Sequence, residues 1–224
     1  MPDHPAPRLV LASANAGKLA ELRALLDGSA VQLVPQGELG VEDVEETGLT
    51  FVENALLKAR HAARVTGLPA LADDSGLCVD ALGGAPGLHS ARYAGSHGDS
   101  AANIARLLGE LDGLPHARRG AHFYAVIVLL RHADDPQPLI AEGVWPGTVL
   151  DAPRGTAGFG YDPVFLDPAL ARTAAELEPA LKNRISHRAR ALERLRADLP
   201  AVLAALGQSG RATPAAAAAD VRLR

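Results

Sequence analysis

The feature that most constrains this sequence is a short apolar run that ends in two adjacent carboxylates. The run, Leu68–Ala72, leads directly into Asp73, Asp74, Ser75 and Gly76. This pattern is expected where a buried strand emerges at its carboxyl end, and open α/β sheets bind ligands at that edge. Neighbouring strand residues point to opposite faces, so we expect one aspartate to act on a ligand and the other to support it. An Asp-Asp-Ser-Gly turn would use the same residue types, and this stretch alone leaves both interpretations open.

Length and composition indicate a single globular domain. With 224 residues, 48% of them hydrophobic and 21% charged, the chain is long enough for one sizeable core. We assign this domain to residues 8–206, a flexible N-terminus to residues 1–7 and an Ala- and Gly-rich tail to residues 207–224. A net charge of −4 argues against nucleic acid as a partner, because binding it needs a basic face.

We expect a cytoplasmic protein. Cys78 is the single cysteine, which excludes an internal disulfide and fits a reducing compartment. Residues 1–7 lack the basic and apolar regions of a signal peptide. No apolar run approaches the ~20 residues that span a bilayer, so we expect no membrane partner.

The first strand is expected to lead into a helix that begins with a cation. Arg8–Ala12 has the pattern of a strand, and Val31–Pro35 that of a second one. Asn15 fits the N-cap of the intervening helix, which places Lys18 in its first turn. There the helix dipole disfavours a cation unless an anion is bound nearby. The pattern therefore gives a mild indication of phosphate binding, although a solvated lysine also fits it.

An acidic loop, residues 42–48, contains two further candidate carboxylates, Glu45 and Glu46. The loop either holds a metal or is simply solvated, and its composition alone favours solvation. Thr50 then opens a helix through a capping box. Lys58 lies in this helix, and its spacing does not decide whether it is functional.

The second half of the chain predicts an antiparallel hairpin and a ligand-binding loop. The hairpin strands are Ala121–Leu130 and Leu139–Val144. The loop, residues 155–163, contains several glycines, which permit close backbone approach to a ligand. Phe159 and Tyr161 offer flat surfaces in this loop on which a base can stack.

A last helix is predicted to begin with two more cations. Ser186 fits its N-cap, so His187 and Arg188 occupy the first turn, against the helix dipole. Because this is the second helix start with that arrangement, the repetition favours phosphate binding.

Six ordered blocks of the chain resemble the inosine/xanthosine triphosphate pyrophosphatase family, over about residues 8–205. The blocks are residues 13–18, 46–55 with Lys58, 72–77, 83–87 with 90–92, 158–163 and 185–188. Six blocks in order are far more specific than any single motif.

The resemblance implies an α/β fold with an elongated mixed β-sheet flanked by helices and two lobes around a central nucleotide cleft. It also implies hydrolysis of the non-standard purine nucleotides ITP, dITP and XTP to the monophosphate and pyrophosphate. This reaction would cleanse the nucleotide pool and prevent misincorporation. The implied cofactor is Mg²⁺, and the implied assembly is a homodimer.

The resemblance also implies residue roles. Asp74 would be the proton acceptor and a Mg²⁺ ligand, with Asp73 as its support and Lys58 near the phosphates. Glu46 and, less directly, Glu45 would complete the metal shell. The implied substrate contacts are Ser13, Ala14, Asn15, Ala16, Gly17, Lys18, Ser75, Phe159, Gly160, Tyr161, Asp162, Lys182, His187 and Arg188.

Two alternatives stay open. One is a Mg²⁺-dependent pyrophosphatase for another modified nucleotide, such as a methylated pyrimidine, which a comparison of substrates would separate. The other is a nucleotide-sensing module without turnover. A sensor is expected to lose some of the charged residues of the site, whereas this chain keeps Asp73, Asp74, Lys18 and Lys58.

Overall fold

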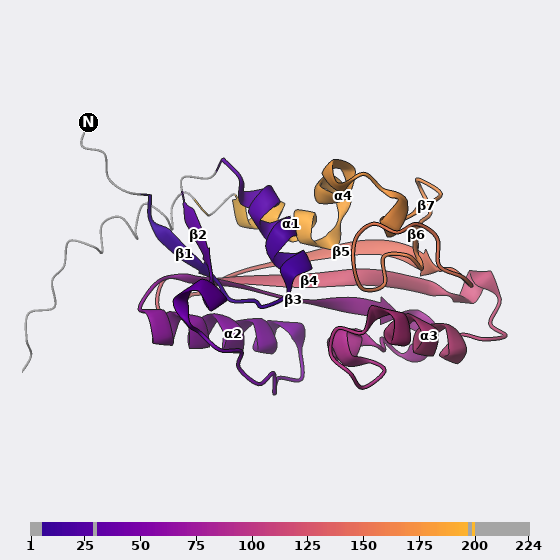
Figure 1. The fold of residues 1–224 in the computed structure, drawn as a ribbon, viewed down its shortest axis with the longest axis horizontal. Helices are drawn as coiled ribbons and strands as arrows, with labels where there is room; N and C mark the ends of the chain where they lie inside the picture. Colours follow the sequence, from indigo (N-terminus) through magenta and orange to yellow (C-terminus); the bar gives the residue numbers. More distant parts are fainter. Residues whose placement is uncertain (1–5, 29–30, 197–198, 200–224) are drawn as a thin grey trace, which may run out of the picture.

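The computed structural model describes residues 6–28, 31–196 and 199, and within them a seven-stranded mixed sheet flanked by helices (Figure 1). The strand order is β2-β1-β3-β4-β5-β6-β7. Strand β1 is parallel to β2 and β3, and the other neighbours are antiparallel. The strands are β1 (Arg8–Leu11), β2 (Gln32–Pro35), β3 (Ala70–Val79), β4 (Gly120–Leu130), β5 (Leu139–Val149), β6 (Phe165–Asp167) and β7 (Arg172–Thr173).

The helices lie on both faces of this sheet. Figure 1 shows α1 and α4 on one side and α2 on the other. The labelled α-helices are α1 (Ala16–Leu26), α2 (Phe51–Thr66), α3 (Ser100–Glu110) and α4 (Pro179–Ile185), and residues 187–196 are also helical. The short 3-10 helices are η1 (Gln36–Leu39), η2 (Asp80–Leu82), η3 (Gly87–Arg92), η4 (His116–Arg118) and η5 (Ala174–Glu176). The predicted α/β class with a mixed sheet is confirmed.

The predicted helix caps form as hydrogen bonds. Asn15 accepts from the Lys18 backbone N–H over 3.0 Å at the start of α1. Thr50 and Glu53 make a reciprocal capping box at the start of α2. Ser186 Oγ accepts from the Ala189 backbone N–H over 3.2 Å, so the helix over residues 187–196 also begins where the sequence predicts.

The long strands pass through hydrophobic cores at two ends of the molecule. At one end, buried side chains cover both faces of the sheet, packed by α1 on one face and by α2 on the other. At the other end, a separate core includes Trp145 and Phe165. In β3, residues 70–72 belong to the first end, whereas Leu77 and Val79 belong to the second. The polar stretch 73–76 therefore lies where β3 passes between the two lobes.

The expectation that a strand ends at Ala72 is wrong, and so is the alternative of a turn. Strand β3 continues through the carboxylates to Val79, with Asp73 opposite Ile127 and Asp74 opposite Val126 of β4. The turn-forming residues stay extended because this antiparallel ladder satisfies their backbone groups. The carboxyl end of a strand at this point belongs to β1, which ends at Leu11 opposite Leu71.

The hairpin prediction is confirmed, because β4 and β5 pair in antiparallel register from Gly120 to Leu129. Strand β5 is longer than predicted and continues to Val149. The predicted tail, residues 207–224, lies outside the described residues, as do residues 1–5 of the predicted N-terminus.

Candidate active site

Asp73 forms the centre of a buried ionic cluster on the α1 side of the sheet. Its carboxylate oxygens lie 2.8 Å from Lys18 Nζ and 3.2 Å from Arg188 Nε, and Ser75 Oγ donates to it over 3.0 Å. Burial opposes ionisation, but Arg188 and Lys18 outweigh it and hold the pKa of Asp73 well below its usual range. Asp73 is therefore an ionised, fully engaged carboxylate, which suits a supporting role.

Asp74 contacts a different cluster, on the α2 side. Its Oδ1 lies 2.8 Å from Lys58 Nζ, and the same nitrogen lies 2.7 Å from Glu46 Oε1. Burial raises the pKa of Asp74 above its usual value, and the attraction of Lys58 offsets only part of that effect. Burial acts in the same direction on Glu46, but there Lys58 outweighs it and the pKa is lowered. Asp74 is therefore the carboxylate of this pair with the higher affinity for a proton, as a proton acceptor requires.

A short 3-10 helix from the other lobe packs directly against this stretch of β3. The Leu77 N–H donates to Ser90 Oγ over 3.0 Å, which ties η3 to the strand. Gly76 permits this approach, because a Cβ there would lie 2.3 Å from the Gly87 carbonyl oxygen. At the end of η3, Arg92 Nη1 lies 3.6 Å from Glu46 Oε2 and adds a fourth charged side chain to Asp74, Lys58 and Glu46.

Lys18 lies in the first turn of α1, as predicted, and it pairs with the carboxylate of Asp73. Ser13 Oγ accepts from the Asn15 N–H over 3.2 Å, and Asn15 caps the helix. Lys18 is 15% exposed and pairs with Asp73. The anion expected near this helix start is therefore supplied here by β3.

The glycine-rich loop places one aromatic ring beside α1. The Phe159 ring lies against Gly17, where a Cβ would be only 2.6 Å from the ring. Asp162 fixes the loop by accepting from the Phe159 N–H over 2.9 Å and from Lys182 Nζ over 2.5 Å. Lys182 Nζ also lies 5.0 Å from the centre of the Phe159 ring.

Tyr161 does not offer the surface that the sequence suggested. It is only 3% exposed, belongs to the core around Trp145, and donates its hydroxyl to the Ser90 carbonyl over 3.0 Å. Of the two aromatic residues in the loop, only the half-buried Phe159 is accessible to a base.

His187 is a buried, neutral side chain with an unsatisfied nitrogen. Its ring stacks on Phe123 with centroids 4.9 Å apart, and its Nδ1 has no hydrogen-bond partner among the described residues. Burial, reinforced by the neighbouring Arg188 charge, lowers its pKa well below the usual value. A buried polar atom without a partner is costly, so this nitrogen is a candidate contact for a ligand.

The structure adds one residue that sequence reasoning missed. Glu21, in α1, contacts Lys182 over 2.8 Å and also pairs with Arg188. The sequence pattern that bears on Glu21 is its spacing from Lys18, because residues three apart lie on the same side of a helix. On spacing alone that position is usually a solvated carboxylate, so nothing marked Glu21 as buried.

The predicted metal ligands are only partly brought together. Asp74 and Glu46 share Lys58, whereas Glu45 is exposed. In the described part of the chain, no three His, Cys, Asp or Glu side chains are close enough to hold a metal ion by themselves. Two neighbouring carboxylates nevertheless suit Mg²⁺, which usually takes one or two carboxylates and completes its shell with waters and substrate phosphates.

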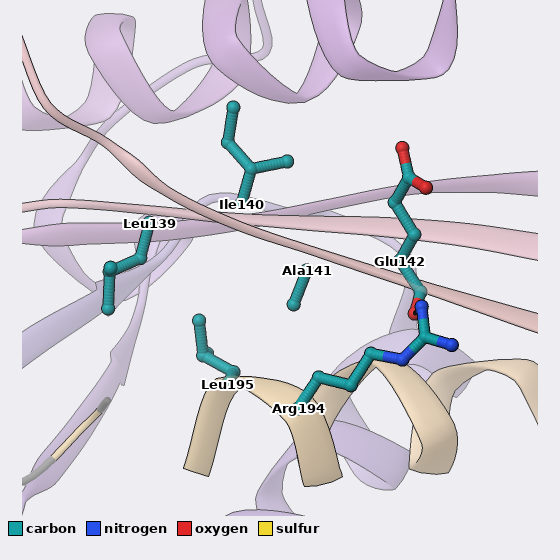
Figure 2. Close-up of a pocket in the computed structure, with 6 residues that line it drawn as sticks. All are labelled: Leu139, Ile140, Ala141, Glu142, Arg194 and Leu195. Carbon is teal, nitrogen blue, oxygen red and sulfur yellow. Dashed lines mark hydrogen bonds between the residues drawn. The ribbon is translucent and has the colours of Figure 1, made fainter. Parts of the chain in front are cut away.

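A separate hollow of about 310 Å³ lies between β5 and the last described helix (Figure 2). It is lined by Leu139, Ile140, Ala141, Glu142, Arg194 and Leu195. Arg194 Nη1 donates to the Glu142 carbonyl over 2.9 Å at one side of it. None of the predicted site residues lines this hollow.

Within residues 6–28, 31–196 and 199, no helix has the length and apolarity needed to cross a bilayer.

Comparisons with known proteins agree on one family. The model of the Ham1 family matches residues 9–198. A dITP/XTP pyrophosphatase of Xanthomonas campestris pv. campestris is 70% identical over 194 residues, covering 87% of this chain and 98% of the relative. One from Yersinia pseudotuberculosis is 57% identical over 186 residues, covering 83% of this chain and 94% of the relative.

Solved structures are similar over the same region. A HAM1 protein from Coxiella burnetii has a TM-score of 0.81 and 52% identity, covering 87% of this chain and 99% of that chain. A nucleoside-triphosphatase / dITP/XTP pyrophosphatase from Mycobacterium abscessus has a TM-score of 0.67 and 46% identity, covering 84% of this chain and 97% of that chain.

Proposed function

The chain belongs to the Ham1 family, and on that basis we propose that it hydrolyses ITP, dITP and XTP to the nucleoside monophosphate and pyrophosphate. Relatives at 57–70% identity are named dITP/XTP pyrophosphatases. The observation in the structure that best supports the proposal is the buried Asp74, whose pKa is raised by burial and which pairs with Lys58. It lies on the strand that also carries Asp73. By removing non-standard nucleotides, the enzyme would prevent their incorporation into DNA and RNA.

In the proposed reaction, Asp74 accepts a proton from the water that attacks the phosphate chain, and the bond between the α and β phosphates breaks. A positioned general base adds about 10²–10⁴-fold to a rate. Lys58 keeps Asp74 in place and, with Lys18, neutralises charge on the phosphates, because phosphoryl chemistry depends mainly on positioning and electrostatics. Asp74 and Glu46 would hold Mg²⁺, which when bound supplies further charge neutralisation on the phosphate oxygens.

The base end of the substrate belongs at Phe159 and His187. Phe159 is half buried and able to stack on a purine. The Arg188 guanidinium already makes four hydrogen bonds, to Asp73, Ser75 and Glu21. His187 Nδ1 lacks a partner in the described chain, so it is the better candidate to meet the purine 6-oxo group. A buried donor there would reject ATP, whose 6-amino group is itself a donor.

The test is pyrophosphate release from ITP, XTP, GTP, ATP and dTTP, each with Mg²⁺ and with EDTA. We expect Mg²⁺-dependent release from ITP and XTP. Release chiefly from dTTP or another nucleotide would replace the proposed substrate class, and no release from any of them would favour a nucleotide-sensing module.

A second measurement tests the role of Asp74. We expect Asp74→Asn to stay folded and to lose most of its activity, because an amide does not accept the proton. Asp134→Asn is the matched control, since Asp134 is 85% exposed and far along the chain from β3. A folded Asp74→Asn variant with near-normal turnover would remove Asp74 from the mechanism.

We also propose a cytoplasmic homodimer. Ile140 and Val144 lie on one face of β5, because they are an even number of residues apart, and are 47% and 42% exposed. Exposed apolar residues that share one face of a strand can mark a contact surface, and here they flank the exposed Glu142. Light scattering after size-exclusion chromatography should give a dimer for the wild type and a monomer for Val144→Glu. A monomeric wild type at micromolar concentration would contradict the proposal.

A further inference from the structure

We propose that Asn103 is a positioning residue that fixes Arg92 for the phosphate chain and so contributes to binding of the pyrophosphate leaving group. The inference rests on the proposed function. Asn103 lies in α3, whose buried apolar residues belong to the core around Trp145. It acts through Arg92 and not by touching the substrate.

Arg92 is a cation of the site whose guanidinium makes no close contact with a carboxylate. The other cations of the site each lie within 3.2 Å of a carboxylate oxygen, namely Lys18, Lys58, Lys182 and Arg188. Arg92 Nη1 is 3.6 Å from Glu46 Oε2, which is longer than a hydrogen bond, and the Arg92 side chain is 35% exposed. Among residues 6–28, 31–196 and 199, its guanidinium donates no hydrogen bond. Its five N–H donors can therefore bind a phosphate, whose geometry they match.

Arg92 lies on the side of the site that the far end of a nucleotide would reach. Phe159, which we propose stacks on the base, lies against Gly17 on the α1 side of the sheet. Arg92 contacts Glu46 on the α2 side, in the cluster around Asp74. Because the proposed bond cleavage takes place at Asp74, the phosphates beyond that bond are the ones closest to Arg92. These are the β and γ phosphates, which leave as pyrophosphate.

Asn103 holds the backbone on both sides of Arg92. Its Oδ1 accepts from the Ala94 N–H over 2.7 Å, and its Nδ2 donates to the Ala91 carbonyl over 3.2 Å. Asn103 is 4% exposed, so both hydrogen bonds are made away from water. An amide side chain has an acceptor and a donor group, and one residue can therefore satisfy both backbone groups. Asn103 thus fixes the point from which the Arg92 side chain extends.

A structural role and a positioning role make different predictions for Asn103. If it only stabilises the end of η3, its removal lowers the free energy of unfolding, and any effect on ligand binding is independent of Arg92. If it positions Arg92, its removal weakens pyrophosphate binding only while the arginine is present. A double-mutant cycle separates the two roles, because changes that act through one another are not additive.

The experiment measures the dissociation constants of pyrophosphate and of IMP by titration calorimetry with Mg²⁺, which needs no turnover. The variants are Asn103→Ala, Arg92→Gln and the double variant, with Asn103→Leu added because it removes the same hydrogen bonds but fills the space. We expect Arg92→Gln and Asn103→Ala each to weaken pyrophosphate binding by about tenfold, as for loss of one hydrogen bond to a charged group, and to change IMP binding by less than about twofold. The double variant should bind pyrophosphate no more weakly than Arg92→Gln.

Asp99→Ala is the matched control, because Asp99 also bonds through its side chain to a backbone N–H, that of Ala102 at the start of α3, over 3.0 Å. This change should lower stability by loss of the cap and leave pyrophosphate binding unchanged. Additive effects in the double variant, equal weakening of IMP binding, or unchanged pyrophosphate binding in either single variant would overturn the proposal, and so would failure of both Asn103 variants to fold. Wild-type protein that binds pyrophosphate but does not turn over ITP would instead refute the proposed function.

Discussion

Replacing Asp73 by Asn should destabilise the protein strongly, although the change adds no bulk. The carboxylate side chain is fully buried and accepts from Lys18, Arg188 and Ser75. An amide keeps only one acceptor oxygen, so its NH₂ group must face one of these donors. Breaking a buried ion pair by removing one charge costs about 3–5 kcal/mol. Arg188 keeps Glu21 as a partner, so we expect the lower end, about 3 kcal/mol.

The loss is measurable by urea unfolding at pH 7 and by thermal unfolding. For a chain of this size, 3 kcal/mol corresponds to a fall in Tm of about 6–12 °C. Asp134→Asn, which removes one partner of an exposed pair with Arg64, should change stability by less than about 1 kcal/mol. A folded Asp73→Asn protein that loses under about 1 kcal/mol, with an unchanged denaturant slope, would refute the view that this carboxylate stabilises the cluster.

Three further predictions follow from the same structure. Because the pKa of Asp73 is lowered on folding, its contribution to stability is present above the unfolded pKa of about 3.9 and is lost as the pH falls through the lower folded pKa. Urea titrations from pH 7 to pH 2 should therefore show the free energies of unfolding of the wild type and of Asp73→Asn approaching each other. Gly143→Ala should lower the free energy of unfolding by about 1–3 kcal/mol, because the new Cβ would lie 1.9 Å from the His187 carbonyl oxygen. Gly109→Ala in α3 has open space around it and should instead raise this free energy by about 0.5–1 kcal/mol. Equal Tm values for the two variants would contradict this difference in packing. Thr50→Ala should cost about 1 kcal/mol by loss of the capping box, measured by urea unfolding.

The sequence predicted those elements in which local patterns and packing agree. The capping residues Asn15, Thr50 and Ser186 mark helix starts because each satisfies a backbone N–H within its own turn. The sequence also predicted the β4–β5 hairpin, because its strands are rich in β-branched and aromatic residues. Such signals depend on neighbouring residues alone.

The residues predicted to form the centre of the site lie in a different local structure from the one expected. Asp73 to Gly76 are turn formers by local preference, yet they are extended inside β3. Arg188, which pairs with Asp73, lies 115 residues away in the chain. No local pattern contains that information. For the same reason Glu21 escaped notice, and Tyr161 was taken for a binding surface although it lies in the core.

The continuity of β3, β4 and β5 through both lobes also bears on how the site can be redesigned. Domain closure normally uses a few loop or terminal residues as hinges, but here three hydrogen-bonded strands belong to both cores. The carboxylates of β3 therefore keep fixed positions relative to both lobes. The parts of the site that can change more easily are the loops that carry Glu46 and Phe159. Changes of nucleotide preference can be sought in those loops, and loop libraries should alter which base is accepted while the β3 carboxylates keep their geometry.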